Sequence, residues 1–242
     1  MTQNIYDNPR FYEGYSRLNR SVQGLDGAPE WPAIRALLPL VADKKVLDLG
    51  CGYGWFSRWA AEQGAASVLG LDVSTKMLAH AEASTQDSRI RYTLADLETL
   101  TVATASVDLA YSSLAFHYIK DLQSLLSAVH AALVPGGHLV FSIEHPIYMA
   151  PRQPGFIEDD QGRKSWPLDS YQHEGPRVTH WLSDGVVKQH RTLGTLLNML
   201  IGTGFTVDHV NEWGPSDEDL KALPTLADER ERPMMLIVAA SR

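Results

Sequence analysis

Short apolar runs alternate with amphipathic segments along most of this chain of 242 residues. The apolar runs have the length of strands, and several lack strict alternation with polar residues, which is typical of parallel strands covered on both faces. Strands are predicted at residues 46–49, 67–73, 89–94, 107–112, 138–144, 205–213 and 234–240. Helices are predicted at residues 29–38, 55–62, 75–84, 114–133 and 193–203. This order indicates an α/β fold with a mostly parallel sheet between two layers of helices.

The first predicted strand runs into a glycine-rich loop. Asp48 is followed by Gly50, Gly52 and Gly54, which are spaced two apart. Glycines let the backbone approach a ligand closely, and the next helix would direct free N–H groups at that ligand. The fingerprint of nicotinamide-dependent dehydrogenases is GxGxxG, with the last glycine admitting a pyrophosphate. An acid followed by GxGxG favours S-adenosylmethionine instead.

Two further acids follow predicted strands. Asp72 ends the run at 67–73, so it should emerge beside the glycine loop, where it could accept both hydroxyls of a ribose. The alternative for Asp72 is an exposed helix-capping role, and Ser74 is placed to cap the next helix. Asp96 follows the third strand and could accept the exocyclic amine of an adenine. We therefore expect Asp48, Asp72 and Asp96 to meet around one adenosyl ligand.

Composition narrows the class of protein. The formal net charge of -8 disfavours a large nucleic-acid surface, which needs clustered Lys and Arg. Cys51 is the single cysteine, so an internal disulfide is excluded, and its place between two glycines favours packing over a reactive thiol. The histidines are scattered without HxxxH or CxxC pairing, so no metal is expected. Without a signal-peptide pattern or a membrane-length apolar run, we expect a cytoplasmic protein with no membrane partner.

The sequence resembles the Rossmann-like, class I S-adenosylmethionine-dependent methyltransferases, in particular the small-molecule branch called methyltransferase type 11. Five motifs stand in the order of that family: VLDLGCGYG at 46–54, LGLDVS at 69–74, ADLE at 95–98, VDLAYSSLAFHY at 107–118 and LVPGGHLVFS at 133–142. The resemblance implies a three-layer, doubly wound sheet of seven strands with the last strand antiparallel. It also implies methyl transfer from S-adenosyl-L-methionine, with S-adenosyl-L-homocysteine as product.

The resemblance implies roles for residues in these motifs. Asp48, Gly50 and Gly52 would surround the methionine part, Asp72 the ribose and Asp96 the adenine amine. The methyl-transfer side would be lined by Ser112, Ser113 and Leu114. Cys51, Val73, Met77 and Leu97 adjoin these positions and complete the expected cofactor contacts.

Segments outside the motifs are expected to cover the site. We divide the single domain into residues 1–40 as an N-terminal helical lid, 41–145 as the cofactor-binding core, 146–191 as an inserted substrate cap and 192–242 as the C-terminal part of the sheet. In the lid, Tyr15 and Arg17 are candidates to hold a carboxylate, although the segment could instead be an arm docked on the core. The cap contains a predicted hairpin turning at Asp184-Gly185, and its alternative role is an oligomer contact.

Candidate catalytic groups lie after the fourth and fifth strands. His145 is the first candidate for general base and His117 the second, because an unperturbed imidazole titrates near working pH. A structural role is the alternative for both histidines. The candidate substrate contacts are Tyr118, Glu144, Trp166, Tyr171 and Trp181.

The sequence therefore predicts methyl transfer to a small-molecule acceptor at oxygen, nitrogen or carbon. The chain has Ser-Ser-Leu-Ala at 112–115 instead of the Asn/Asp-Pro-Pro-Tyr box, which disfavours amide or base acceptors in DNA. One alternative is a binding protein or sensor that holds S-adenosylmethionine without transferring its methyl group. Another is a nicotinamide-dependent oxidoreductase, which the glycine spacing disfavours. A monomer and a homodimer are both compatible with the sequence.

Overall fold

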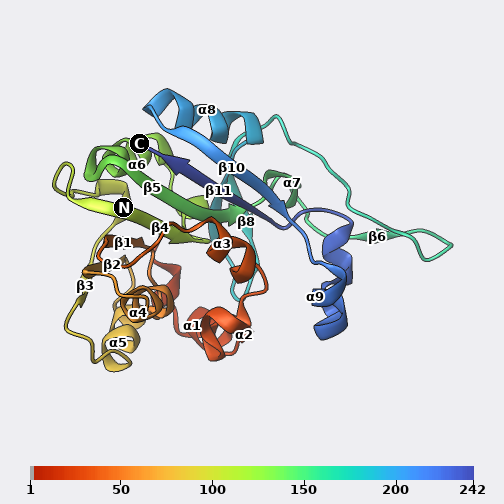
Figure 1. The fold of residues 1–242 in the computed structure, drawn as a ribbon. Helices are drawn as coiled ribbons and strands as arrows, with labels where there is room; N and C mark the ends of the chain where they lie inside the picture. Colours follow the sequence, from red (N-terminus) through yellow and green to blue (C-terminus); the bar gives the residue numbers. More distant parts are fainter. Residues whose placement is uncertain (1–2) are drawn as a thin grey trace.

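The computed structural model describes residues 3–242, which form a sheet covered by helices on both faces (Figure 1). Within that range, seven strands pair in the order β10-β11-β5-β4-β1-β2-β3. Their bounds are β1 Lys45–Leu49, β2 Ser67–Asp72, β3 Ile90–Leu94, β4 Val107–Ser113, β5 Leu133–Glu144, β10 Thr206–Trp213 and β11 Met235–Ser241. All are parallel except β11, which is antiparallel to both neighbours, β5 and β10. The predicted fold class is confirmed.

The helices stand largely where the helical spacing predicted them. Their bounds are α3 Trp31–Leu37, α4 Trp55–Glu62, α5 Thr75–Ala83, α6 Leu122–Ala132 and α8 Leu193–Thr203. One further helix, α9 Asp217–Ala222, was not predicted. Ser74 caps α5 as predicted, because its hydroxyl accepts from the Met77 N–H at 3.1 Å. No helix within residues 3–242 is long and apolar enough to cross a membrane.

Two predicted boundaries differ from the structure. The helix predicted at 114–133 is split into η4 (Phe116–Tyr118) and α6, because Asp121 accepts a hydrogen bond from the Ser124 N–H and begins a new helix. The strand predicted at 138–144 begins earlier, at Leu133, so residues 135–137 lie inside β5. Pairing with β11 extends that strand, and the N–H of Gly136, at a φ of 76°, donates to the carbonyl of Arg242.

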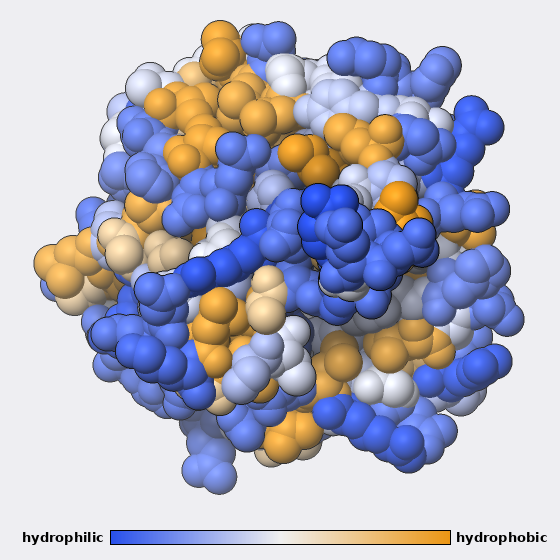
Figure 2. Space-filling view, turned by 90° about the vertical axis from the view of Figure 1, so that its right-hand side faces the viewer, coloured by the Kyte–Doolittle hydropathy of each residue, from blue (hydrophilic) through white to orange (hydrophobic). Residues whose placement is uncertain are grey.

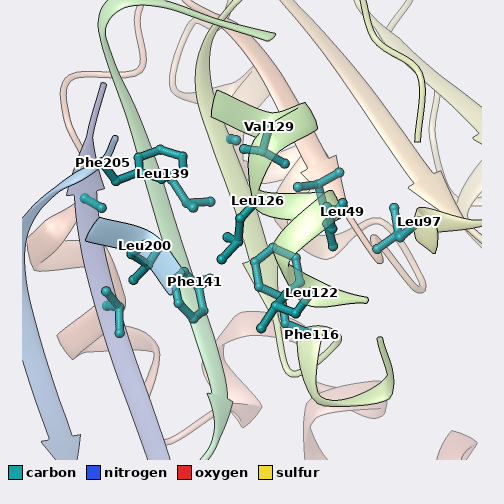
Figure 3. Packing of buried hydrophobic residues seen from close by; sticks show 14 of the residues in the cluster. Leu49, Leu97, Phe116, Leu122, Leu126, Val129, Leu139, Phe141, Leu200 and Phe205 are labelled. Carbon is teal, nitrogen blue, oxygen red and sulfur yellow. The ribbon is translucent and has the colours of Figure 1, made fainter. Parts of the chain in front are cut away.

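Alternate residues of each central strand belong to two separate hydrophobic cores, one on each face of the sheet. On one face, α6 and α8 pack on Leu47, Leu49 and Phe141 (Figure 3). On the other face, α3 and α4 pack on Val46, Val68, Leu109, Val140 and Ile237. Burial on both faces explains the continuous apolar runs in the sequence, and it fixes the register that brings the carboxyl ends of the strands to one edge.

The inserted segment forms two hairpins of different character. One pairs β6 (Ile157–Glu158) with β7 (Lys164–Ser165), is exposed, and projects away from the sheet (Figure 1). Figure 2 faces this side and shows hydrophilic side chains around separate groups of hydrophobic ones. The other pairs β8 (Gly175–Thr179) with β9 (Val186–His190), as predicted. Its connection runs over 180–185, however, and is longer than a turn at Asp184-Gly185 alone.

The second hairpin packs against the N-terminal segment, which contains η1 (Ile5–Asp7), α1 (Pro9–Ser16), α2 (Asn19–Val22) and η2 (Gly24–Gly27). Ile5, Phe11 and Val186 form a small buried cluster between the two. The Phe11 ring meets Trp181 edge-on, with 5.5 Å between ring centres. These two segments, distant in sequence, together form a roof over the edge of the sheet where the strands end.

Candidate active site

A cavity of about 250 Å³ lies at the carboxyl ends of β1 to β5, beneath the roof. Asp48, Asp72 and Asp96 all line it, so the three acids predicted to meet share one hollow. The sheet order places them in a row on neighbouring strands, β1, β2 and β3. Ser113 on β4 and Glu144 on β5 extend the row in the opposite direction. Ligands of open α/β sheets bind at this edge.

The glycine loop is fixed to the end of β2. The N–H groups of Gly50 and Cys51 donate to the carbonyl of Leu71 at 2.8 and 2.9 Å, and the Gly52 N–H donates to Asp72 Oδ2 at 2.9 Å. Gly50 has a φ of 77°, and a Cβ there would lie 2.5 Å from the Cβ of Ala115. A Cβ on Gly52 would meet no heavy atom within 4 Å. The loop is thus tight beside β4 and open at Gly52.

The two central acids are buried and hydrogen-bonded. Asp48 Oδ2 accepts from the Ser57 hydroxyl at 2.6 Å, and Asp72 Oδ1 accepts from the Ser74 N–H at 2.8 Å. Burial, opposed by the bond from Ser57 and reinforced by the nearby charge of Asp72, raises the pKa of Asp48 to about 7. A cationic group placed beside Asp48 would favour its ionised form.

The N-terminal segment places one basic side chain at the cavity, and it is Arg20 instead of the predicted Arg17. Arg17 is exposed and pairs with exposed Glu13, because α1 ends at Ser16 and leaves Arg17 facing outward. Arg20 lines the cavity instead, and its Nη2 donates to both carboxylate oxygens of buried Glu30 at 2.9 and 3.1 Å. Tyr15 also lines the cavity, as predicted.

Most of the other predicted cofactor contacts line the cavity, and Ser112 does not. Cavity-lining residues among them are Gly50, Cys51, Gly52, Val73, Met77, Leu97, Ser113 and Leu114. Ser112 does not line the cavity, because its side chain is fully buried and its hydroxyl donates to the carbonyl of Leu49 at 2.7 Å. Of the proposed substrate contacts, Tyr118, Glu144 and Trp181 line the cavity.

Trp166 and Tyr171, the other two proposed substrate contacts, do not line the cavity. The indole N–H of Trp166 donates to the carbonyl of Ile147, and its ring stacks on Tyr148 with 5.7 Å between ring centres. The Tyr171 hydroxyl accepts from the N–H of Leu193 at 3.0 Å. Trp166 therefore packs on the first residues of the inserted segment, and Tyr171 holds that segment to the start of α8.

The two histidine candidates have different surroundings. His145 is buried outside the cavity, where Nδ1 accepts from the Ile147 N–H at 3.0 Å and Nε2 bonds to Glu212 Oε1 at 2.8 Å. It caps the short helix α7 (Pro146–Met149), which explains why it does not face the hollow. His117 does line the cavity, and its Nδ1 accepts from the N–H of Glu144 at 3.4 Å.

Several cavity residues were not foreseen from the sequence. Arg20, Glu30, Tyr6, Tyr148 and Met234 line the hollow but belong to no motif. The aromatic and basic residues of the N-terminal segment were the available signal for Tyr6 and Arg20. Among residues 3–242, His, Cys, Asp and Glu side chains form no group of three or more that could hold a metal.

Comparison with known proteins identifies the class of ligand. The family description "Methyltransferase domain" matches residues 47–141. A structure of an S-adenosylmethionine-dependent methyltransferase from Mesorhizobium loti is 58% identical, with a TM-score of 0.88 over 90% of this chain and 100% of that one. A putative S-adenosylmethionine-dependent methyltransferase from Listeria monocytogenes is 39% identical, with a TM-score of 0.84 over 90% and 99%.

A malonyl-[acyl-carrier protein] O-methyltransferase from Enterobacter lignolyticus is 39% identical over 110 residues, which are 46% of this chain and 43% of that protein. That relative is therefore similar over less than half of either sequence.

The cavity fits the cofactor of these relatives. A row of three acids in one hollow and a glycine loop open at Gly52 suit an adenosyl group joined to an amino acid. The similarity to the Mesorhizobium loti structure extends over all of that chain, beyond the shared motifs. The predicted family, cofactor and class of enzyme are thereby confirmed, and this chain belongs to the S-adenosylmethionine-dependent methyltransferases.

Proposed function

We propose that the protein transfers a methyl group from S-adenosylmethionine to a small-molecule acceptor bound under the roof. The observation that carries this proposal is a single hollow that continues from the acids of β1 to β3 to the ends of β4 and β5. Its second half is enclosed by side chains of the N-terminal segment and the insertion, which suits a small, partly apolar acceptor.

The cofactor end is assigned to residues on β1 to β3. We propose that Asp72 accepts from the ribose hydroxyls and that Asp96 accepts from the adenine amine, with Val73, Met77 and Leu97 against the base. Asp48 and the loop at Gly50 and Gly52 would surround the amino-acid part. S-adenosylmethionine, when bound, supplies an electrophilic methyl group on a positively charged sulfur.

We assign the methionine carboxylate to Arg20. This guanidinium lines the cavity beside Tyr15, and both of its bonds to Glu30 come from Nη2, so its other N–H groups can donate to a ligand. Glu30 is fully buried and holds the guanidinium in one orientation. Arg20 thereby takes the role that the sequence had suggested for Arg17.

Neither histidine suits the role of general base in the arrangement seen here. His145 lies outside the cavity, and the Nδ1 of His117 accepts a backbone bond, which leaves Nε2 protonated and able to donate. Burial and the charges of Lys188 and Arg191 hold the pKa of His117 well below its usual value, so its ring is neutral. The protein's main tasks are then alignment of the acceptor and exclusion of water.

The test is a two-stage assay on the full chain. Titration calorimetry should show tight binding of S-adenosylhomocysteine and none of NAD. A screen for release of S-adenosylhomocysteine over a library of small metabolites should then find acceptors that are turned over. Binding of the cofactor without turnover of any small molecule, together with methylation of a macromolecule, would contradict the proposal.

A further inference from the structure

The end of the cavity at β4 and β5 lies beyond the space assigned to the cofactor. Asp48 lies on β1, Asp72 ends β2 and Asp96 follows β3. Glu144 ends β5, two strands from β1 in the opposite direction. Neighbouring strands lie about 4.8 Å apart, so Glu144 is about 10 Å from the strand that carries Asp48. This end is where an acceptor would bind if the proposed function holds.

Glu144 is the acid at this end, and an ion pair with a residue outside the cavity holds its carboxylate in place. Lys188 on β9, almost fully buried, donates from Nζ to Glu144 Oε1 at 2.5 Å. Glu144 lines the cavity whereas Lys188 does not, so the ion pair turns its negative end toward the hollow. The second oxygen, Oε2, has no hydrogen-bond partner within residues 3–242 and can accept from a ligand.

The charges along the wall favour a cationic ligand. Of residues 3–242, five carboxylates line the cavity, namely Glu30, Asp48, Asp72, Asp96 and Glu144. Within the same range, Arg20 is the one Lys or Arg side chain that lines it, and Arg20 is already paired with Glu30. Even with Asp48 protonated, four carboxylates remain against the positive charges of Arg20, Lys188 and S-adenosylmethionine, so the net charge of the wall stays negative. An anionic acceptor would therefore meet repulsion, and an ammonium attraction.

Aromatic rings surround the same space. Tyr6, Tyr118 and Tyr148 line the cavity, and the hydroxyls of Tyr6 and Tyr118 are 3.4 Å apart. Burial, and after it the charge of Glu144, raises the pKa of Tyr148 to about 12, so its phenol is neutral. Faces of neutral aromatic rings attract cations, and more strongly where water is excluded.

We propose that the acceptor carries an amine, which binds as an ammonium against Glu144 among the rings of Tyr6, Tyr118 and Tyr148, and that the reaction is N-methylation. This inference rests on the proposed function and names its substrate class. The ammonium first releases one proton to solvent, and the lone pair of the resulting amine then forms the new C–N bond. The bond from the methyl carbon to sulfur breaks, its electron pair stays on sulfur, and one proton is released for each methyl group transferred.

The experiment compares three probes of matched shape on the full chain loaded with S-adenosylhomocysteine: 2-phenylethylamine, 2-phenylethanol and phenylacetate. Their dissociation constants are measured by ligand-observed NMR. We expect the amine to bind at least about tenfold more tightly than the alcohol or the acid, from the combined effect of the carboxylate and the rings. In Glu144→Gln/Lys188→Met, which leaves neither partner as an unpaired buried charge, this preference should fall to about twofold or less.

Two controls make the result decisive. Glu158→Gln, on the exposed hairpin that projects from the sheet, should keep the full preference for the amine. The double variant should bind S-adenosylhomocysteine as the parent does, which shows that the site is intact. Equal or tighter binding of phenylacetate, no amine binding up to its solubility limit, or an unchanged preference in the double variant overturns the inference. If S-adenosylhomocysteine itself fails to bind the parent chain, the proposed function fails instead.

Discussion

Replacing Arg20 by Met tests the assignment of the methionine carboxylate. Within residues 3–242, Arg20 is the one Lys or Arg side chain lining the cavity. A hydrogen bond between two charged groups contributes about 1.5–3 kcal/mol, so its loss should weaken binding of S-adenosylhomocysteine by about 10- to 150-fold. Because Glu30 is fully buried, Arg20→Met alone would also leave an unpaired acid, so Arg20→Met/Glu30→Gln is the preferred variant.

The assay is titration calorimetry with two ligands. S-adenosylhomocysteine carries the amino-acid part, whereas 5′-methylthioadenosine lacks it and keeps the adenosyl group. The double variant should lose affinity for the first ligand and keep its affinity for the second. Arg17→Met is the matched control, since Arg17 is exposed and pairs with exposed Glu13, and it should leave both affinities unchanged.

The reasoning is refuted if the Arg20 variant binds S-adenosylhomocysteine as tightly as the parent does. Equal losses for the two ligands would also refute it, because they would show general damage to the site. A loss in Arg17→Met but not in the Arg20 variant would restore the expectation drawn from the sequence.

Three other predictions concern groups around the cavity. Because burial first, and then the charge of Asp72, raises the pKa of Asp48 to about 7, the folded chain keeps a proton that the unfolded chain releases above about pH 4. The contribution of Asp48 to the free energy of unfolding should thus fall from about pH 4 to 7, by at most about 4 kcal/mol, and urea unfolding of Asp48→Asn should lack this fall. Asp72→Ala leaves two backbone N–H groups without their acceptor, which should cost about 2–4 kcal/mol in urea unfolding and lower the affinity for S-adenosylhomocysteine. The Arg232 guanidinium lies 4.4–5.2 Å from three aromatic ring centres, so Arg232→Met should lower the free energy of unfolding by about 1–3 kcal/mol and lower Tm. Arg163→Met, on the exposed hairpin, should change neither quantity.

The sheet, the positions of the three acids and the glycine loop could be predicted because the sequence signals for them are local. Asp48, Asp72 and Asp96 each follow an apolar run, and parallel pairing necessarily brings the ends of such runs to one edge. The glycines of the loop, with positive φ at Gly50, Gly52 and Gly54, were equally plain in the sequence. The sheet and the cofactor end of the cavity therefore followed from patterns a few residues long.

The roof could not be predicted residue by residue. Whether Arg17 or Arg20 faces inward depends on where α1 ends and on contacts between Phe11 and Trp181, which are distant in sequence. His145 directly follows β5, as the sequence indicates, but its partner Glu212 lies on β10. Nothing within a few residues of His145 indicates that bond. Side-chain direction in both cases is decided by tertiary contacts.

The reversed direction of β11 has a consequence for how such a site can diversify. Since β11 is antiparallel to β5, its first residues lie at the carboxyl end of β5, and the carbonyl of Met234 accepts the N–H of His145 there. The connection over 214–234 therefore ends at Met234, which lines the cavity at the carboxyl end of β5. Insertions and substitutions in that connection can therefore change the shape of the proposed acceptor end, while the residues proposed to bind the adenosyl group, on the opposite half of the sheet, stay unchanged.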